Sequence, residues 1–181
     1  NLFAMPVMCE YIKNLNIDDL VVVSPDTGFA KQARIFADQL GVDVAIGDKV
    51  RRAHDENAEV LSLIGDVKGK NALIVDDFTI SGGTLISTAK MLKNMGAKKV
   101  YAAVSHILAK EKEVEKIDNS PIENLISTDT IYNPFVEKSS KILIASMAPF
   151  FAEALKRIHE RESVSSLFDE LPKEIKEHLK K

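Results

Sequence analysis

The sequence predicts an α/β fold, a parallel sheet flanked by helices, from two observations. Short apolar runs alternate with longer amphipathic segments along most of the chain. This alternation is typical of βαβ units, in which each helix returns the chain to the start of the next parallel strand. Two glycines also stand where helices are expected to end, at Gly41 and Gly96.

The expected elements follow one another in a regular order. The apolar runs predict strands over 20–23, 42–46, 72–75, 100–104, 125–128 and 142–145. The amphipathic segments predict helices over 29–40, 85–95, 110–116 and 149–162. Four polar residues come just after expected strands, namely Asp26, Asp48, Asp76 and His106. Because ligands bind beyond the carboxyl ends of parallel strands, we expect these side chains to meet in one crevice.

Length and composition predict one domain over residues 1–168, followed by a charged tail over 169–181 that forms a solvated helix or a frayed end. The polar stretch 48–59 is expected to be mobile. The chain opens at Asn1 on helix-like sequence, which suggests a fragment whose upstream partner domain is missing.

The charge and cysteine content exclude several classes of protein. The 181 residues carry a net charge of -3 with dispersed Lys and Arg, which argues against a nucleic-acid binder. No apolar run approaches the roughly 20 residues that span a bilayer, so no membrane association is expected. Cys9 is the single cysteine, which excludes an internal disulfide and fits a cytoplasmic location.

The segment Asn71 to Leu85, NALIVDDFTISGGTL, indicates the chemistry. An expected strand ends in Asp76 and Asp77, and Ser81-Gly82-Gly83-Thr84 leads into a helix. Glycines and the unpaired N–H groups of a helix start suit a phosphate. Adjacent carboxylates suit sugar hydroxyls or a divalent cation. The segment therefore predicts a site for a phosphorylated sugar, and the alternative is an ordinary strand–turn–helix connection.

Five blocks of sequence resemble the C-terminal half of ribose-phosphate pyrophosphokinases, and the resemblance covers about nine-tenths of the chain. In chain order, they are a VSPD turn at 23–26, a K-x-R loop at 48–51, an IGDV hairpin at 63–67, the phosphoribosyl loop at 75–84 and an ESIS-x-LF-like terminus at 162–168. The phosphoribosyl loop by itself is shared with type I phosphoribosyltransferases, whose fold the resemblance implies. The blocks together favour the synthetase.

This resemblance implies transfer of the diphosphoryl group of ATP to ribose 5-phosphate, with Mg²⁺. The expected catalytic cations are Lys49, Arg51 and Arg52. Asp26 is the expected metal ligand, and the sugar phosphate is expected on Asp76, Asp77, Ser81, Gly82, Gly83 and Thr84. Expected partners are the N-terminal half of the same protein and, in a homo-oligomer, further copies. That half supplies most nucleotide contacts and a magnesium-binding His in the family, so this chain alone is expected to be inactive.

Departures from the family pattern leave alternatives open. Ile80 replaces a third Asp of the loop, Ser81 replaces Thr, and Phe29 stands where a second glycine follows the VSPD turn. A phosphoribosyltransferase would need a hood domain for its base, and no segment suggests one. A non-catalytic regulatory paralogue is favoured slightly by Ile80. Asp26 could be a plain turn residue, the three cations a solvated loop face, and His106 a structural residue.

Overall fold

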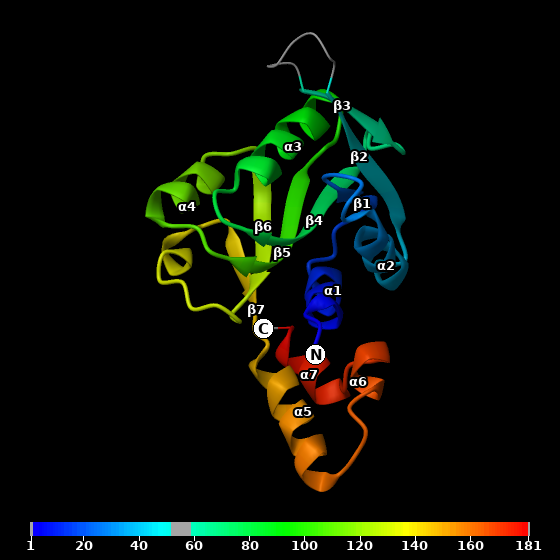
Figure 1. Cartoon of the computed structure of the whole chain (residues 1–181), viewed down its shortest axis with the longest axis vertical. Coiled ribbons are helices and arrows are strands. Elements are labelled where there is room, and N and C mark those ends of the chain that lie inside the picture. Colours follow the sequence, from blue (N-terminus) through cyan, green and yellow to red (C-terminus); the bar gives the residue numbers. More distant parts are fainter. Residues whose placement is uncertain (1, 52–58, 181) are drawn as a thin grey trace.

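The computed structural model describes residues 2–51 and 59–180, and its centre is a seven-stranded sheet (Figure 1). The strand order is β3-β2-β1-β4-β5-β6-β7, and every neighbouring pair is parallel except β2 and β3. The strands are β1 (Leu20–Ser24), β2 (Asp43–Arg51), β3 (Glu59–Ile64), β4 (Asn71–Thr79), β5 (Val100–Ile107), β6 (Ile122–Thr128) and β7 (Ile142–Ala145). The predicted α/β class is confirmed.

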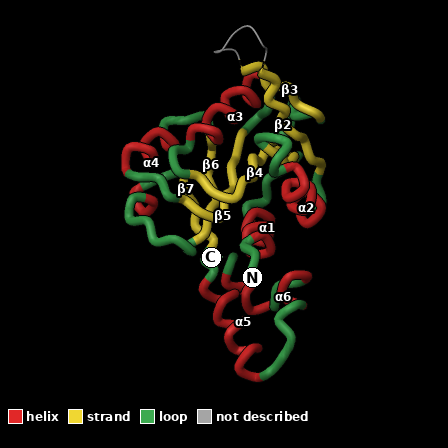
Figure 2. Tube along the Cα trace, in the orientation of Figure 1, coloured by secondary structure: helices red, strands yellow, loops and turns green. Residues whose placement is uncertain are grey.

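Two layers of helices cover the sheet, as the tube view shows (Figure 2). On one face, α1 (Met5–Asn14) and α2 (Ala30–Leu40) pack with residues such as Val22 and Leu73. On the other face, α3 (Gly83–Asn94) and α4 (Glu111–Asp118) pack with Val23, Ile74 and their neighbours. Because both faces are covered, the central strands are apolar throughout rather than alternating.

The chain beyond β7 forms a third helical group that lies away from the sheet in Figure 1. It comprises α5 (Ala148–Glu160), α6 (Ser166–Asp169) and α7 (Lys173–His178), and a short 3₁₀ helix, η1 (Val136–Lys138), precedes β7. Leu171, Ile175 and Leu179 are buried in this group together with Val7 of α1. The tail is therefore helical over α7, as one of the two expectations holds, but one of its faces is buried rather than solvated. The apolar residues at every fourth position form one buried face. In the sequence this pattern is hard to recognise because most of the neighbouring residues are charged.

The strands run further than the apolar runs indicate. Beyond their buried residues, β4 and β5 continue to pair, with Phe78 opposite His106. Asp76 and His106 therefore lie inside strands rather than after them. Similarly, β2 continues through Asp48 to Arg51 because it pairs with β3 in antiparallel fashion. The part of the expected mobile stretch over 52–58, including Arg52, lies outside the described residues.

The expected helix ends at two glycines are met in the structure. Gly41 ends α2 with a left-handed φ of 72°, and Gly96 follows α3 with φ of 90°, so both helices end at glycines as predicted. Among the helices of residues 2–51 and 59–180, none combines the length and apolarity that crossing a membrane requires.

Candidate functional site

The predicted site residues gather at the carboxyl ends of three adjacent strands. The turn at Asp26 follows β1, and the Asp76-Asp77 pair lies near the end of β4, which is the neighbour of β1. On the other side of β1, the far part of β2 carries Lys49 and Arg51. The fold therefore brings the acidic residues and the strand with the expected cations to the same edge of the sheet.

Asp26 holds the turn that leads into α2. Its Oδ1 accepts hydrogen bonds from the N–H groups of Gly28 at 2.8 Å and Phe29 at 3.2 Å. The Ser24 hydroxyl donates to the Asp26 carbonyl oxygen at 2.6 Å. Within the described residues, Oδ2 accepts no hydrogen bond. Asp26 is thus a turn residue, as the simpler interpretation holds, and it still has a carboxylate oxygen for a ligand.

The two carboxylates of β4, those of Asp76 and Asp77, lie close to each other and to other negative charge. The Asp77 N–H donates to Asp76 Oδ1 at 2.9 Å, and the Phe78 N–H donates to Asp77 Oδ1 at 2.8 Å. The pKa of the half-buried Asp76 is raised from 3.8 to about 6, chiefly by burial and in addition by the negative charges of Asp77 and Asp26. The repulsion from Asp26 links the β1 turn electrostatically to the end of β4. A bound cation, or hydroxyl groups that donate hydrogen bonds, would stabilise the carboxylates at this end of β4.

The loop between β4 and α3 places backbone N–H groups at the start of a helix. Gly82 has φ of 70°, and its N–H donates to Thr79 Oγ1 at 3.0 Å. The first helical hydrogen bond runs from the Ile86 N–H to the Gly82 carbonyl oxygen. The N–H groups of Thr84 and Leu85 find no acceptor among the described residues, and the Gly83 N–H contacts only Ser81 Oγ, at 3.2 Å. Unpaired N–H groups at a helix start attract phosphate.

Gly82 is required for more than its backbone angle. A Cβ at this position would lie 2.9 Å from Cγ1 of Ile117, so the loop packs directly against α4. The left-handed φ would strain any other residue as well. The glycine therefore fixes the loop on a rigid helix behind it.

Gly47, which is not among the predicted site residues, has an equivalent role on β2. A Cβ there would lie 2.7 Å from the Pro25 carbonyl oxygen and 3.1 Å from that of Ser24. Glycine therefore lets β2, which carries Lys49, pass directly against the turn that holds Asp26. An isolated glycine within a strand pattern is the signal that could have identified this close approach.

His106 and Ile80 border the site without joining its acidic edge. His106 Nδ1 forms a hydrogen bond of 2.7 Å with Thr130 Oγ1, which supports its structural interpretation. Ile80, in place of a carboxylate, is 59% exposed. The side chain at this position therefore faces solvent beside the loop rather than filling the core.

The arrangement fits a magnesium ion that takes part of its coordination from elsewhere. In the part of the chain that the structure describes, no group of three or more His, Cys, Asp or Glu side chains is placed to hold a metal. Mg²⁺ usually keeps several waters and binds one or two carboxylates together with substrate phosphates. Either Asp26 or the Asp76-Asp77 pair offers one or two carboxylates of that kind, with oxygen ligands only.

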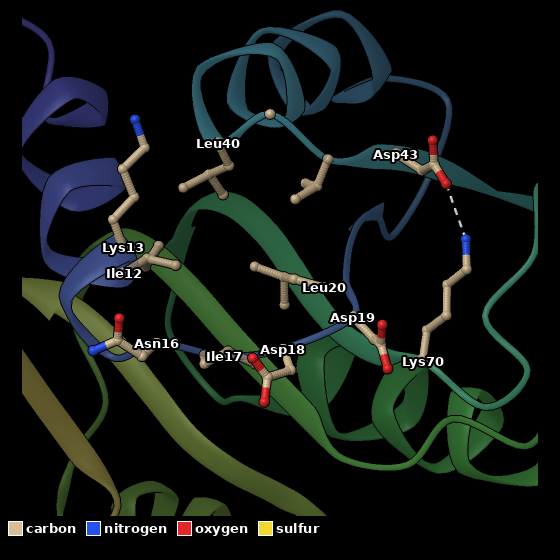
Figure 3. A pocket seen from close by; sticks show the side chains of 12 residues that line it. Ile12, Lys13, Asn16, Ile17, Asp18, Asp19, Leu20, Leu40, Asp43 and Lys70 are labelled. Carbon is tan, nitrogen blue, oxygen red and sulfur yellow. Dashed lines mark hydrogen bonds and ion pairs between the residues drawn. The ribbon is translucent and has the colours of Figure 1, made fainter.

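A separate pocket of about 720 Å³ lies at the opposite edge of the sheet (Figure 3). Its apolar floor includes Leu20 and Leu40, and its rim carries Lys13 together with the Lys70–Asp43 ion pair of 2.9 Å. These residues lie at the amino ends of β1 and β2, whereas the predicted site lies at the carboxyl ends. The pocket is therefore not part of the candidate site.

Sulfate or ribose 5-phosphate is expected to bind at the loop from Ser81 to Thr84. Crystals soaked with either compound should show density within hydrogen-bond distance of the N–H groups of Gly83 and Thr84, because these amides lie at the positive end of α3. An empty loop at saturating sugar phosphate would contradict the assignment.

Replacing Asp76 by Asn is expected to stabilise the chain at neutral pH without divalent metal. A carboxyl group whose pKa is raised to about 6 on folding destabilises the folded state progressively as pH rises from about 4 through 6. Asn keeps the Oδ1 acceptor and removes the charge. After allowance for solvent screening, about 1 kcal/mol is expected, or roughly 2–4 °C in Tm at pH 7.

The Tm difference should shrink as pH falls from 7 to 4, because wild-type Asp76 then becomes neutral in the folded state. Thermal melts in EDTA across this pH range measure it. Glu137→Gln, which alters an exposed carboxylate of η1, serves as the control and should show no such trend. A lower Tm for Asp76→Asn at pH 7 would show that the folded protein does not penalise this charge.

Comparisons with known proteins show which family the chain resembles. The phosphoribosyl synthetase-associated domain matches residues 50–169. The chain is 44% identical over 169 residues to a ribose-phosphate pyrophosphokinase of Caldanaerobacter subterraneus, covering 93% of this chain and 53% of the relative. It is also 44% identical over 170 residues to the enzyme of that name from Chlorobaculum tepidum, covering 93% and 52%.

A solved structure shows the same likeness in three dimensions. The phosphoribosylpyrophosphate synthetase of Mycobacterium smegmatis superposes with a TM-score of 0.76 at 30% identity, covering 87% of this chain and 51% of that one. The chain thus spans about half the length of the curated relatives it matches.

Proposed function

Because the chain belongs to the phosphoribosyl synthetase-associated domain family, we propose that it is the sugar-phosphate-binding half of a ribose-phosphate pyrophosphokinase. The full-length protein would transfer the β,γ-diphosphoryl group of ATP to the 1-hydroxyl of ribose 5-phosphate. The products are phosphoribosyl pyrophosphate, a precursor in nucleotide biosynthesis, and AMP.

One observation carries this proposal: two carboxylates near the end of β4 are followed by a helix-start loop in which the N–H groups of Thr84 and Leu85 find no acceptor within residues 2–51 and 59–180. In the proposed complex, Ser81, Gly82, Gly83 and Thr84 hold the 5-phosphate through amides and hydroxyls. Asp76 and Asp77 accept hydrogen bonds from the ribose hydroxyls. This arrangement fixes the sugar so that its 1-hydroxyl can meet the phosphate chain of ATP in line.

The basic residues and the metal ligand would balance the negative charge of the reacting phosphates. Diphosphoryl transfer spreads negative charge over phosphate oxygens, so catalysis depends on nearby cations. Lys49 and Arg51, on β2, and Arg52, which follows it in sequence, would neutralise that charge. Bound Mg²⁺ would screen the phosphates of ATP, and Asp26 would hold it through Oδ2. The raised pKa of Asp76 supports a cation at this edge, because positive charge would relieve the repulsion there.

The same proposal includes the partners and the cellular location of the enzyme. The other half of the protein would supply most of the ATP site, and further copies would complete a homo-oligomer. A cytoplasmic location fits the single cysteine, Cys9, which is buried and unpaired.

The test is AMP formation by the full-length protein from ATP, ribose 5-phosphate and Mg²⁺. Turnover that needs all three compounds supports the proposal. Release of pyrophosphate from phosphoribosyl pyrophosphate and a purine or pyrimidine base, without AMP formation, would instead identify a phosphoribosyltransferase. Binding of ribose 5-phosphate with neither reaction would identify a regulatory paralogue, as the exposed Ile80 in place of a carboxylate would favour.

A further inference from the structure

Phe78 differs from the other apolar residues of β4 because it is exposed. The residues from Ala72 to Val75 are 0% exposed, whereas Phe78 is 48% exposed. It follows the Asp76-Asp77 pair directly and precedes Thr79, whose Oγ1 accepts a hydrogen bond from the Gly82 N–H at 3.0 Å. Single exposed apolar residues are common on protein surfaces. This ring, however, lies at the edge of the sheet where the proposed sugar phosphate binds.

The Phe78 ring and the loop at Ser81 to Thr84 lie at one edge of the sheet but on opposite faces. Thr79 points to the loop, because its Oγ1 contacts the Gly82 N–H. The partner of Thr79 on β5, Ile107, is buried on the same face, with α3 and α4. Since successive side chains of a strand alternate between the two faces, Phe78 points to the other face. A ligand anchored on the loop therefore meets this ring after crossing the edge, where the acidic pair lies.

His106 stands beside Phe78 on the neighbouring strand. The two residues are paired in the register of β4 and β5, so their side chains share one face, with about 4.8 Å between the strands. His106 Nδ1 forms a hydrogen bond of 2.7 Å with Thr130 Oγ1, which is itself 2.7 Å from Thr128 Oγ1. These contacts fix the imidazole ring before any ligand binds, which lowers the entropy lost on binding. Phe78 and His106, together the ring pair, thus form an aromatic surface at this edge.

We propose that this edge binds a nucleoside 5′-monophosphate, with the base stacked on the ring pair. The inference rests on the proposed function, which places the 5-phosphate on the loop at Ser81 to Thr84 and the ribose hydroxyls on Asp76 and Asp77. A nucleoside 5′-monophosphate presents the same phosphate and hydroxyl groups and adds a planar base. Every nucleobase has an apolar face that stacks on aromatic side chains. The ring pair supplies such side chains across the edge from the loop.

The base would take the place of the reacting hydroxyl. In a nucleoside 5′-monophosphate the base is bonded to C1 of the ribose, which in ribose 5-phosphate carries the hydroxyl that accepts the diphosphoryl group. The nucleotide therefore has no acceptor at C1, and it excludes ribose 5-phosphate from the shared phosphate and hydroxyl contacts. AMP, a product of the proposed reaction, belongs to this class. Because a purine covers more of the ring pair than a pyrimidine does, AMP should bind more tightly than UMP.

Calorimetry on the 181-residue chain tests the proposal, with AMP, UMP and ribose 5-phosphate as titrants. Phe78→Ala should weaken AMP binding by at least about fivefold, the lower end of what loss of one base–aromatic stack costs. The same variant should leave the affinity for ribose 5-phosphate unchanged. Phe78→Tyr keeps a stacking ring and should keep AMP binding. Phe151→Ala is the matched control, because it removes a ring of similar exposure, 42%, from α5, which lies away from the sheet.

Saturating ribose 5-phosphate should abolish AMP binding, because the two ligands share the loop. AMP binding that persists beside ribose 5-phosphate would overturn the proposal, since the base site would then be separate. An unchanged AMP affinity in Phe78→Ala would also overturn it, as would equal loss of both ligands, which would make the ring a structural support. If ribose 5-phosphate does not bind the wild-type chain, the proposed function is rejected. If it binds and the AMP affinity does not depend on Phe78, only this inference is rejected.

Discussion

Replacing Lys49 by Ala in the full-length protein is expected to lower kcat by about 10²–10³-fold and to leave KM for ribose 5-phosphate almost unchanged. A cation that meets the transferred group mainly in the transition state contributes to kcat rather than to substrate binding. Loss of one such electrostatic contact typically costs about 3–4 kcal/mol of transition-state stabilisation. The strand β2 that carries Lys49 runs beside the Asp26 turn, where Gly47 allows close approach, and this position of the backbone supports the proposed role.

Steady-state kinetics with each substrate varied in turn measures this split. Lys112→Ala, which removes an exposed cation from α4, is the control and should leave both constants unchanged. If KM for the sugar rises steeply and kcat holds, Lys49 is a substrate-binding residue. If neither constant changes, the cations of this segment are a solvated face of the strand and loop.

The 181-residue chain by itself is expected to form no AMP from ATP, ribose 5-phosphate and Mg²⁺, although it should bind the sugar phosphate. It carries the loop at Ser81 to Thr84 and the acidic edge, but it matches only about half the length of its relatives. Both reactants must be held in line for transfer, and the entropy lost in fixing ATP is uncompensated where its site is incomplete.

Calorimetry with ribose 5-phosphate and an AMP assay on the same sample separate binding from turnover. The other half, added as a separate polypeptide, should restore part of the activity if the halves dock. A rate of roughly 1–100 per second, as in ordinary kinases, from the chain alone would show that it holds a complete active site.

The acidic edge and the loop were predictable from sequence because their signals are local. Asp76, Asp77 and Gly82 lie close together in the chain, and the strand–loop–helix order fixes where each backbone group goes. Local pattern did not predict how far strands extend. Pairing with β3 and β5 extends β2 and β4 past their buried residues, and this pairing depends on partners distant in the chain.

The sequence by itself determined the α/β class, the ends of α2 and α3 at Gly41 and Gly96, and the strand–loop–helix order of the β4–α3 segment, for which phosphate binding remains a prediction. Periodicity and glycine conformation are properties of short segments, so they can be inferred without knowing the fold. Only the tertiary structure decided that burial, together with the charges of Asp77 and Asp26, raises the pKa of Asp76 and that Gly47 packs on Pro25. It also decided that Phe150 and Ala154 are the buried apolar residues of α5. Periodicity shows which residues share a face of a helix, but it does not show what each face packs against.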